Sequence, residues 1–449
     1  EWPSYDKSPE GKVIRVLGPA GEHEAEIHSI MAEFDLPFEF PESVEAEAEV
    51  LSEQLEPEEI KRRRDFRDIP TFTIDPVDAK DFDDALSVKP LDNGHLEVGI
   101  HIADVTYYVN PKTLLEREAS DRATSVYLVD RTIPMLPERL SNGLCSLRPN
   151  EDKFTFSAVF DLDQNGHIHK EWFGRTVIHS DRRFTYEQAQ EIIEGQQGDY
   201  QKEVLQLNEL AQKLRKQRFR EGAINFETRE VRFQLAEDGT PLGVTPRVRK
   251  EAHKLVEEFM LLANKKVAQF VYDYHNGKAK NTFVYRTHDY PDPEKVNTFA
   301  QFAKRFGHEM NLGEGQVSNS INKLISEIEG SPEENVLQQL AIRAMSKAKY
   351  TTSADIHFGL AFQHYTHFTS PIRRYPDMMV HRLLQRYLND QKPVDAQPVE
   401  EQCIHSSERE KRAADAERAS IKYKQVEFMR NAEDKPYLGC LLYTSDAAD

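Results

Sequence analysis

The pattern of apolar and polar residues predicts strands in the first half of the chain and helices in the second. Residues 71–75 (TFTID) alternate with the period of two that a strand shows. Residues 85–105 are typical of two strands joined by a turn at Asp92-Asn93-Gly94, and 154–174 of a second hairpin with Gly166 in its turn. Apolar residues then recur at helical spacing in six segments: 185–194, 201–220, 250–272, 293–311, 317–329 and 334–348. We therefore expect an α+β fold in which helices surround a mixed or antiparallel sheet.

The two ends of the chain have patterns of their own. Before residue 61 the sequence predicts a strand at 11–17, a short helix at 22–35 and an acidic helix or linker at 42–60. Near the other end, Ser370 followed by Pro371 is a typical helix start, and this helix should run to about Leu388. A linker at 391–402 and a highly charged helix at 405–430 should follow. No apolar run approaches the roughly 18 residues of a membrane span, so we expect no contact with a membrane.

Net charge alone gives a misleading first picture of possible partners. The chain has 77 acidic and 58 basic residues, and its formal net charge of −19 argues against a nucleic-acid partner. However, residues 1–60 hold 17 acidic and three basic side chains, a net charge of −14, so the rest of the chain carries only −5. A single basic run is usually solvated surface, but several runs with aromatic residues nearby, such as those at 61–67 and 213–220, fit a nucleic-acid channel better. The three cysteines form no CxxC pair, which excludes a disulfide scaffold and a cysteine-ligated zinc site.

Five carboxylates fall within ten positions directly after the first predicted strand of the sheet: Asp75, Asp78, Asp81, Asp83 and Asp84. Crowded carboxylates raise each other's pKa, and a divalent cation relieves that cost. Hard oxygen donors suit Mg²⁺, with Mn²⁺ as a substitute. The alternative is an exposed acidic turn without an ion. Ile74 and Phe82 are apolar, as expected if a core holds the loop in place, and they favour the metal site.

A second group of candidate residues lies at 365–381, around the predicted start of a helix. The free N–H groups and the positive end of a helix dipole suit a phosphate, and Arg373 and Arg374 add bidentate donors for the same anion. Alternatively, Ser370 only caps the helix and the arginines pair with the acidic loop. Together, metal-holding carboxylates and a phosphate-holding helix end serve displacement at phosphorus.

Histidine and aromatic residues give weaker indications. His101, His364 and His367 could each ligate a metal, but a histidine with satisfied hydrogen bonds in a core is the more common case. Four aromatic residues lie in polar, loop-like sequence and could stack on nucleobases or belong to a core: Tyr127, Tyr186, Phe226 and Tyr365.

Six motifs, in order along the chain, carry a resemblance to a known family. They are DIPTFTIDPVDAKDFDDALSV, HIADVTYYV, VYLVDRTIPMLPERLSNGLCSL, EGAINFET, HKLVEEFMLLAN and HFTSPIRRYPDMMVHRLL. In this order they resemble the catalytic RNB domain of the ribonuclease II/ribonuclease R superfamily, over roughly 62–390, and the third motif is more similar to the bacterial ribonuclease R branch. The resemblance implies a 3′-to-5′ exoribonuclease that hydrolyses RNA processively to nucleoside 5′-monophosphates with one or two Mg²⁺ ions.

The resemblance also implies roles for individual residues. The four family aspartates that hold the metal fall on Asp75, Asp81, Asp83 and Asp84, so that Asp78 is an additional acid. Arg373 corresponds to the arginine that steadies the scissile phosphate. The remaining positions along the RNA path are Tyr127 and Phe226 as the pair that clamps terminal bases, Tyr186, Ser370, Arg374, and a glutamate that is either Glu257 or Glu258.

The family architecture implies a division of the chain that extends beyond its catalytic part. The expected parts are the C-terminal part of a cold-shock (OB-like) domain at 1–47, an acidic linker at 48–61, the catalytic domain at 62–390, a linker and helix leading to a missing S1 domain at 391–439, and a tail at 440–449 that resembles a translated sequencing adapter. The chain would then be truncated at both ends. The expected partner is the 3′ end of single-stranded RNA, bound by a monomer in the cytoplasm.

Two other functions compete with the exoribonuclease. A non-catalytic RNA-binding module would have lost one or more of the motif aspartates, and all four are present. A metal-dependent phosphodiesterase acting on DNA or another phosphodiester would keep them, and only its substrate preference would reveal it.

Overall fold

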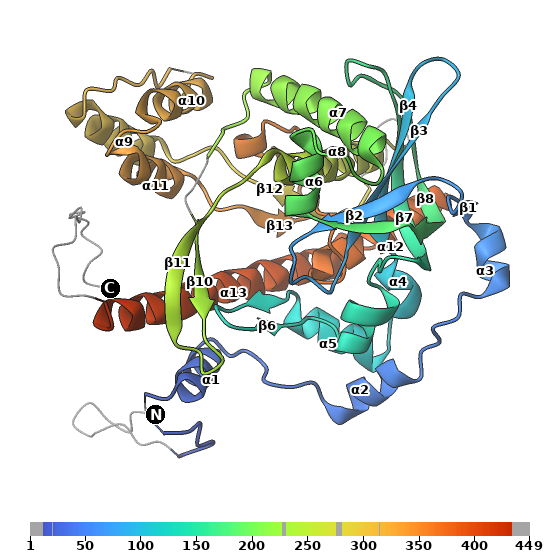
Figure 1. The fold of residues 1–449 in the computed structure, drawn as a ribbon, viewed down its shortest axis with the longest axis horizontal. Coiled ribbons are helices and arrows are strands. Elements are labelled where there is room, and N and C mark those ends of the chain that lie inside the picture. The colour runs from blue at the N-terminus through green and yellow to red at the C-terminus, as the bar shows by residue number, and fades with distance from the viewer. Residues whose placement is uncertain (1–11, 20, 227–229, 275–280, 314, 433–449) are drawn as a thin grey trace.

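A seven-stranded mixed sheet forms the centre of the fold (Figure 1). The computed structural model describes residues 12–19, 21–226, 230–274, 281–313 and 315–432. The strands lie in the order β1-β8-β7-β4-β3-β2-β9, and their bounds are β1 Arg64–Asp65, β2 Thr71–Asp75, β3 Asp84–Pro90, β4 Leu96–Ala103, β7 Glu151–Leu162, β8 Ile168–Ser180 and β9 Arg182–Thr185. Both expected hairpins, β3–β4 and β7–β8, are present and antiparallel, whereas the edge strands β1 and β9 pair in parallel with β8 and β2. The expected mixed sheet of an α+β fold is thus confirmed.

Helices surround this sheet and extend to one side of it (Figure 1). Around the sheet they are α3 Pro57–Arg62, α4 Val105–Tyr108, α5 Leu114–Arg122, α6 Tyr186–Ile193, α7 Gln201–Arg220, α8 Glu251–Asp273 and α12 Tyr375–Leu388, with the π-helical turn η1 Arg139–Leu144 and the 3-10 turn η3 Phe358–Leu360. The helices α9 Pro293–Arg305, α10 Val317–Ile328 and α11 Glu334–Ala344 stand apart with a small core of their own. Three short two-stranded sheets complete the body: β5 Val126–Tyr127 with β6 Thr132–Ile133, β10 Glu230–Leu235 with β11 Pro241–Arg247, and β12 Tyr285–Thr287 with β13 Lys349–Thr351.

A second, smaller core joins both ends of the described chain to the β5–β6 hairpin. Helix α1 (His23–Glu33) contributes Ile27, Ile30 and Met31, while the hairpin contributes Val126, Leu128 and Ile133. Ala416 of the long helix α13 (Ala396–Arg430) closes the cluster from the other side. The backbone N–H of Val129 also donates to Ser420 Oγ of α13 at 3.1 Å. The hairpin is therefore held between α1 and α13, which lie far apart in the sequence.

Several expected elements differ from those observed. Residues 12–18 form no strand, because no described strand pairs with them and Val13, Ile14 and Val16 are exposed. Helix α9 ends at Arg305 and α11 at Ala344, earlier than their apolar spacing indicated. Only α2 (Glu42–Glu49) and α3 form within 42–60, and α13 begins inside the expected linker, capped by Asp395. The tail at 440–449 lies outside the described residues. None of the described helices has the length and apolar character that a membrane span requires.

His101 lies in the centre of the sheet as a neutral, fully hydrogen-bonded side chain. Its Nε2 lies 2.8 Å from Ser87 Oγ and its Nδ1 lies 2.7 Å from Ser157 Oγ. Gly99 makes room for the ring, because a Cβ at that position would lie 2.4 Å from His101 Nε2. The interpretation of this histidine as a core residue is thus confirmed.

We expect His101 alone to lower the free energy of unfolding by about 2 kcal/mol between pH 7 and pH 5. Burial lowers the pKa of His101 to about 3. Below pH 6.5 the unfolded chain therefore takes up a proton that the folded chain does not, so stability falls as the pH falls. Urea unfolding of His101→Gln, which cannot take up this proton, should depend less on pH over the same range. An unchanged pH dependence would contradict the assignment.

Candidate active site

The acidic loop connects β2 to β3 at one end of the sheet. Asp75 is the last residue of β2 and Asp84 the first residue of β3. The two strands pair only at Thr71–Ser87 and Phe72–Leu86, so they have separated where the carboxylates occur. Because Ile74 and Phe82 are buried in the main core, the loop is fixed to the sheet on both sides.

Burial raises the pKa of all four motif aspartates. Burial, together with a smaller effect of the nearby Asp84 carboxylate, raises the pKa of Asp75 to about 8. The pKa of Asp84 rises to about 6. Burial also raises the pKa of Asp81 and of Asp83, and the positive charge of Arg373 only partly offsets this effect. The loop therefore keeps several carboxyl groups in an environment that disfavours their negative charge.

Two observations indicate that these carboxyl groups suit a divalent cation: their oxygen donors, and one buried carboxylate oxygen that has no hydrogen-bond partner. Asp75 Oδ2 is buried and accepts no hydrogen bond. Oxygen donors of this kind are the preferred ligands of Mg²⁺ and Mn²⁺. Among the described residues, no three of these carboxylates offer oxygen atoms that all lie within 4.8 Å of one another.

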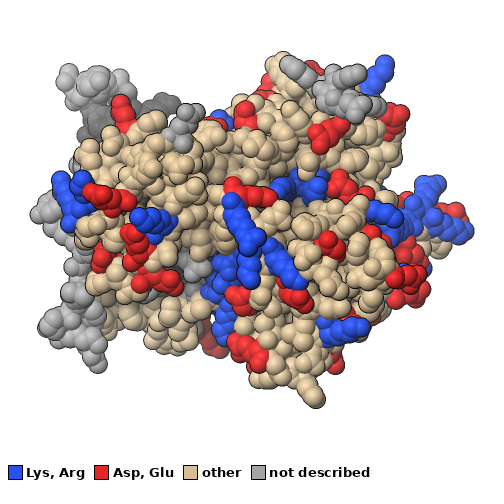
Figure 2. Space-filling view, turned by 90° about the horizontal axis from the view of Figure 1, so that it is seen from above, with Lys and Arg blue, Asp and Glu red and all other residues tan. Residues whose placement is uncertain are grey.

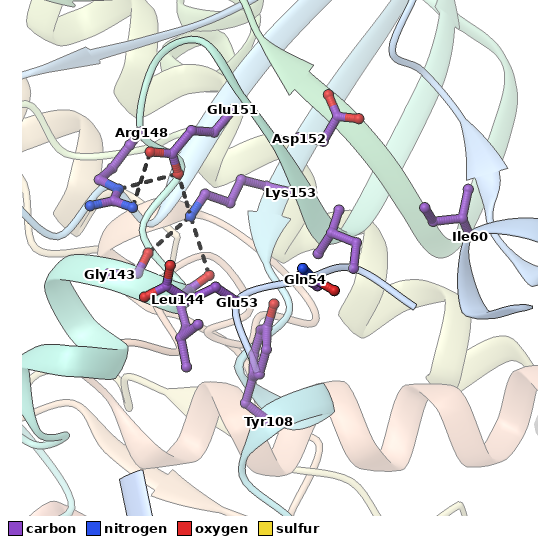
Figure 3. A pocket seen from close by; sticks show the side chains of 11 residues that line it. Glu53, Gln54, Ile60, Tyr108, Gly143, Leu144, Arg148, Glu151, Asp152 and Lys153 are labelled. Atoms are coloured by element: carbon purple, nitrogen blue, oxygen red, sulfur yellow. Dashed lines mark hydrogen bonds and ion pairs between the residues drawn. The ribbon is translucent and has the colours of Figure 1, made fainter. Parts of the chain in front are cut away.

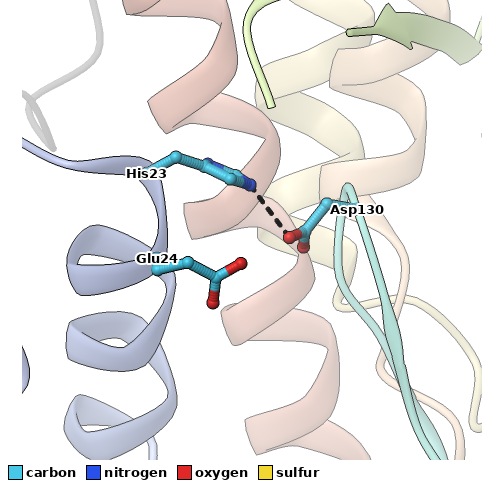
Figure 4. A group of neighbouring side chains, drawn as sticks. All are labelled: His23, Glu24 and Asp130. Atoms are coloured by element: carbon cyan, nitrogen blue, oxygen red, sulfur yellow. Dashed lines mark hydrogen bonds and ion pairs between the residues drawn. The ribbon is translucent and has the colours of Figure 1, made fainter. Parts of the chain in front are cut away.

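The closely grouped ligand atoms belong to His23, Glu24 and Asp130 (Figure 4). His23 Nε2 lies 3.0 Å from Asp130 Oδ2. Arg131 Nη2 lies 2.7 Å from Glu24 Oε1 and 2.7 Å from Asp130 Oδ2, so a guanidinium already neutralises both carboxylates. This group is an ion-pair cluster that ties α1 to the turn of the β5–β6 hairpin.

The turn at 370–374 brings a cation to the acidic loop from a distant part of the sequence. The backbone N–H of Ile372 donates to Asp83 Oδ1 at 2.9 Å, across 289 positions of the chain. Arg373 Nε lies 3.7 Å from Asp83 Oδ2, and its Nη2 donates to Ser370 Oγ at 3.0 Å. Arg373 is still 40% exposed at its side chain, so its guanidinium can meet a ligand. Asp83 and Arg373 thus form the centre of the candidate site.

The expected helix start at Ser370 is wrong, because helix α12 begins at Tyr375 with Arg374 at its N-cap. Asp377 explains the difference. Its Oδ1 accepts the backbone N–H of Ser370 at 2.7 Å and Arg374 Nη2 at 2.8 Å, which holds 370–374 as a turn in front of the helix. Arg374 therefore supports the turn, and Arg373 is the one of the two arginines whose guanidinium lies beside Asp83.

Tyr127 lies at the edge of this site. The backbone N–H of Ser125 donates to the carbonyl of Arg373 at 2.9 Å, so the strand that carries Tyr127 is fixed to the same turn. Burial is the main reason why the pKa of Tyr127 is raised to about 12. Arg373 opposes this rise, and the nearby Asp81 and Asp83 add to it. The residue is nevertheless 40% exposed.

The other two expected aromatic residues, Phe226 and Tyr186, pack against other parts of the described structure. Phe226 packs beside the clusters that α9, α10 and α11 form, next to Met310 and Met345, and no described ring contact joins it to Tyr127. Tyr186 begins α6, and its ring stacks on that of His253 with 4.0 Å between centroids.

The two glutamates of the VEE motif differ in their surroundings. Glu258 is buried, and Arg218 of α7 donates two hydrogen bonds to its carboxylate. Glu257 is more exposed and pairs with Arg249. Glu258 therefore holds α7 against α8, which leaves Glu257 as the more accessible of the two.

Sequence reasoning missed two arginines that act on the loop. Arg183 lies on β9 opposite Thr73 of β2, donates to the carbonyl of Pro76 and lowers the pKa of Asp75 against the effect of burial. Arg232 of β10 lies 2.6 Å from the exposed carboxylate of Asp78, which separates this additional acid from the other four. No local signal marks either residue, because each reaches the loop through a pairing between distant segments.

Comparison with known proteins places this fold and site in a family. The chain matches the RNB domain over residues 63–390 and the cold shock domain over residues 1–41. It is 37% identical to Ribonuclease R 1 of Lactococcus lactis subsp. lactis, with 97% of this chain and 54% of that protein covered. It is 38% identical to Ribonuclease R of Aquifex aeolicus, with 98% of this chain and 63% of that protein covered. The chain thus spans between half and two thirds of these relatives.

A solved structure supports the same relationship. The fold matches RNase R of Mycoplasma genitalium in complex with ribose methylated single-stranded RNA with a TM-score of 0.86. The match covers 92% of this chain and 66% of that one, at 29% identity. The chain therefore belongs to the RNB domain family, the ribonuclease II/ribonuclease R superfamily that its motifs resemble.

Proposed function

We propose that the chain is a 3′-to-5′ exoribonuclease that hydrolyses single-stranded RNA processively to nucleoside 5′-monophosphates. The observation that carries the proposal is the meeting of the buried Asp83 carboxylate with the turn of Arg373, which joins acidic oxygen donors to a phosphate donor at one point. Ribonuclease R relatives of known sequence and the RNA-bound structure of one homologue support RNA as the substrate.

Four carboxylates would hold the metal in this proposal: Asp75, Asp81, Asp83 and Asp84. When bound, one or two Mg²⁺ ions supply an acidified water and neutralise charge at the scissile phosphate. Arg373 donates to the phosphate oxygens as negative charge grows on them in the transition state. Ser370 Oγ accepts from Arg373 Nη2 and so fixes the direction of the guanidinium.

Tyr127 would stack on a base near the 3′ end and so place the next phosphate at the carboxylates. Figure 2 shows Lys and Arg side chains near the centre of the face seen from above, with acidic side chains between them. Helix α7 carries six basic residues, a distribution that suits a polyanion despite the net charge of the chain. We propose Phe226, Tyr186 and Glu257 as further contacts along the RNA path, on the resemblance alone.

A labelled oligonucleotide tests this function. With Mg²⁺ and 5′-labelled single-stranded RNA, we expect the labelled strand to shorten from its 3′ end while nucleoside 5′-monophosphates are released. Chelation of the metal by EDTA should stop the reaction. A matched DNA strand should remain intact, because contacts to the 2′-OH distinguish RNA from DNA. Equal digestion of DNA would favour a general phosphodiesterase, and RNA binding without cleavage would favour a non-catalytic module.

A further inference from the structure

The segment at 145–147 lies against the acidic loop and forms hydrogen bonds with it. Ser146 is completely buried there. Its Oγ accepts the backbone N–H of Phe82 at 3.0 Å and donates to the carbonyl of Lys80 at 2.7 Å. The backbone N–H of Leu147 also donates to the carbonyl of Phe82 at 3.0 Å. One hydroxyl therefore bridges the two peptide groups on either side of Asp81.

The segment that carries Ser146 is itself fixed to the sheet at both ends. Lys153 of β7 donates from Nζ to the carbonyl of Gly143 at 2.9 Å and pairs with Glu151 at 2.9 Å (Figure 3). Beyond Ser146, the carbonyl of Leu147 accepts Ser180 Oγ of β8 at 3.1 Å. Gly143 and Lys153 line a cavity of about 590 Å³ whose lining includes none of the four loop aspartates. The Ser146 hydroxyl thus links the acidic loop to a segment that is fixed to β7 and β8.

The turn at 370–374 also fixes the acidic loop, through Asp83. The carboxylate of Asp83 accepts the N–H of Ile372, while the peptide before it is held through Phe82. Asp81 has no such backbone donor from the turn at 370–374. The direction in which its carboxylate leaves the loop is therefore set by the peptides that Ser146 bridges.

We propose that Ser146 is a positioning residue that fixes the spacing of the Asp81 and Asp83 carboxylates and thereby sets the affinity of the loop for a divalent cation. This inference rests on the proposed function, because it assigns a metal to the loop. It gives a role to Ser146 of the SNGLCSL motif, a residue to which the proposed function assigns none. Residues that orient metal ligands typically change metal affinity 10–100-fold when they are replaced.

Mn²⁺ binding without RNA tests the proposal. We expect Ser146→Ala to weaken Mn²⁺ binding by at least about 10-fold. Binding is measured by electron paramagnetic resonance at a temperature below the melting temperature of the variant. Ser146→Cys keeps the shape of the side chain with a somewhat larger atom but has only a weak donor, and it should weaken binding in the same direction. The matched control is Ser141→Ala, because Ser141 is also buried and donates only to the carbonyl of Pro137, in the same segment. Its affinity for Mn²⁺ should remain within about twofold of the unmodified chain.

The outcomes separate this inference from the proposed function. Wild-type affinity in both Ser146 variants overturns the positioning role. Equal losses in the Ser146 variants and in Ser141→Ala also overturn it, because they indicate a general effect on folding. If the unmodified chain binds no Mn²⁺, or if Asp83→Asn binds it as tightly, the proposed function fails instead. A loss confined to the Ser146 variants supports the inference, and Ser146→Cys provides this measurement if Ser146→Ala does not fold.

Discussion

Replacing Asp83 with Asn is expected to lower the rate of mononucleotide release from single-stranded RNA by at least about 10²-fold while RNA binding is retained. The fold should tolerate the change, because the Asn Oδ1 can still accept the N–H of Ile372 that Asp83 Oδ1 accepts at 2.9 Å. What is lost is the negative charge that lies beside Arg373 and would hold the proposed metal. The rate is measured as the release of labelled mononucleotides from uniformly labelled RNA at saturating Mg²⁺, and binding by fluorescence anisotropy.

A control within the same loop makes this result specific. Asp78→Asn removes the same charge, but Asp78 is 61% exposed and pairs with Arg232 outside the site. We expect this variant to release mononucleotides at a rate close to that of the unmodified chain. Equal losses in both variants would show that the overall charge of the loop, and not the Asp83 carboxylate, determines activity.

Replacing Arg373 with Ala should lower kcat by about 10²–10³-fold with a smaller effect on KM. The guanidinium lies beside Asp83 and is oriented by Ser370, so its stabilisation is greatest when the phosphate gains charge in the transition state. Arg373→Lys should recover only part of the loss, because a lysine cannot donate two parallel hydrogen bonds to a phosphate.

Arg232→Ala is the matched control for this second experiment. Arg232 is also a base beside the acidic loop, but its partner is the exposed Asp78. Its removal should change the salt dependence of RNA binding more than kcat. A change in KM alone for Arg373→Ala would mean that Arg373 binds RNA uniformly and does not act on the transition state.

The elements that could be predicted from the sequence are those that depend on neighbouring residues. The β3–β4 and β7–β8 hairpins were predictable because a glycine with positive φ, Gly94 or Gly166, marks each turn. The parallel pairing of β9 with β2 and the β10–β11 hairpin were not predicted. For β9 the reason is distance, because residues 72–75 meet residues 182–185. The start of α12 differs from the predicted one because the buried Asp377, and not Ser370, organises the turn before it.

The candidate site shows the same division between local and distant information. The density of aspartates in one loop is a local signal, and it indicated a metal before any fold was known. The surroundings of these aspartates are not local. Arg183 and Ser146 reach the loop from strands and turns that are more than 60 positions away, and neither has a sequence pattern that distinguishes it from an ordinary surface arginine or core serine.

The small core between α1, the β5–β6 hairpin and α13 has a consequence for where the catalytic unit ends. Sequence similarity to the RNB domain covers residues 63–390, which excludes both helices that enclose this core. A boundary drawn by similarity would therefore remove the helices that cover Val126, Leu128 and Ile133, and the first two of these residues directly flank Tyr127. The smallest unit that keeps this aromatic residue in place is therefore larger than the span that matches the RNB domain, because it also needs α1 and α13.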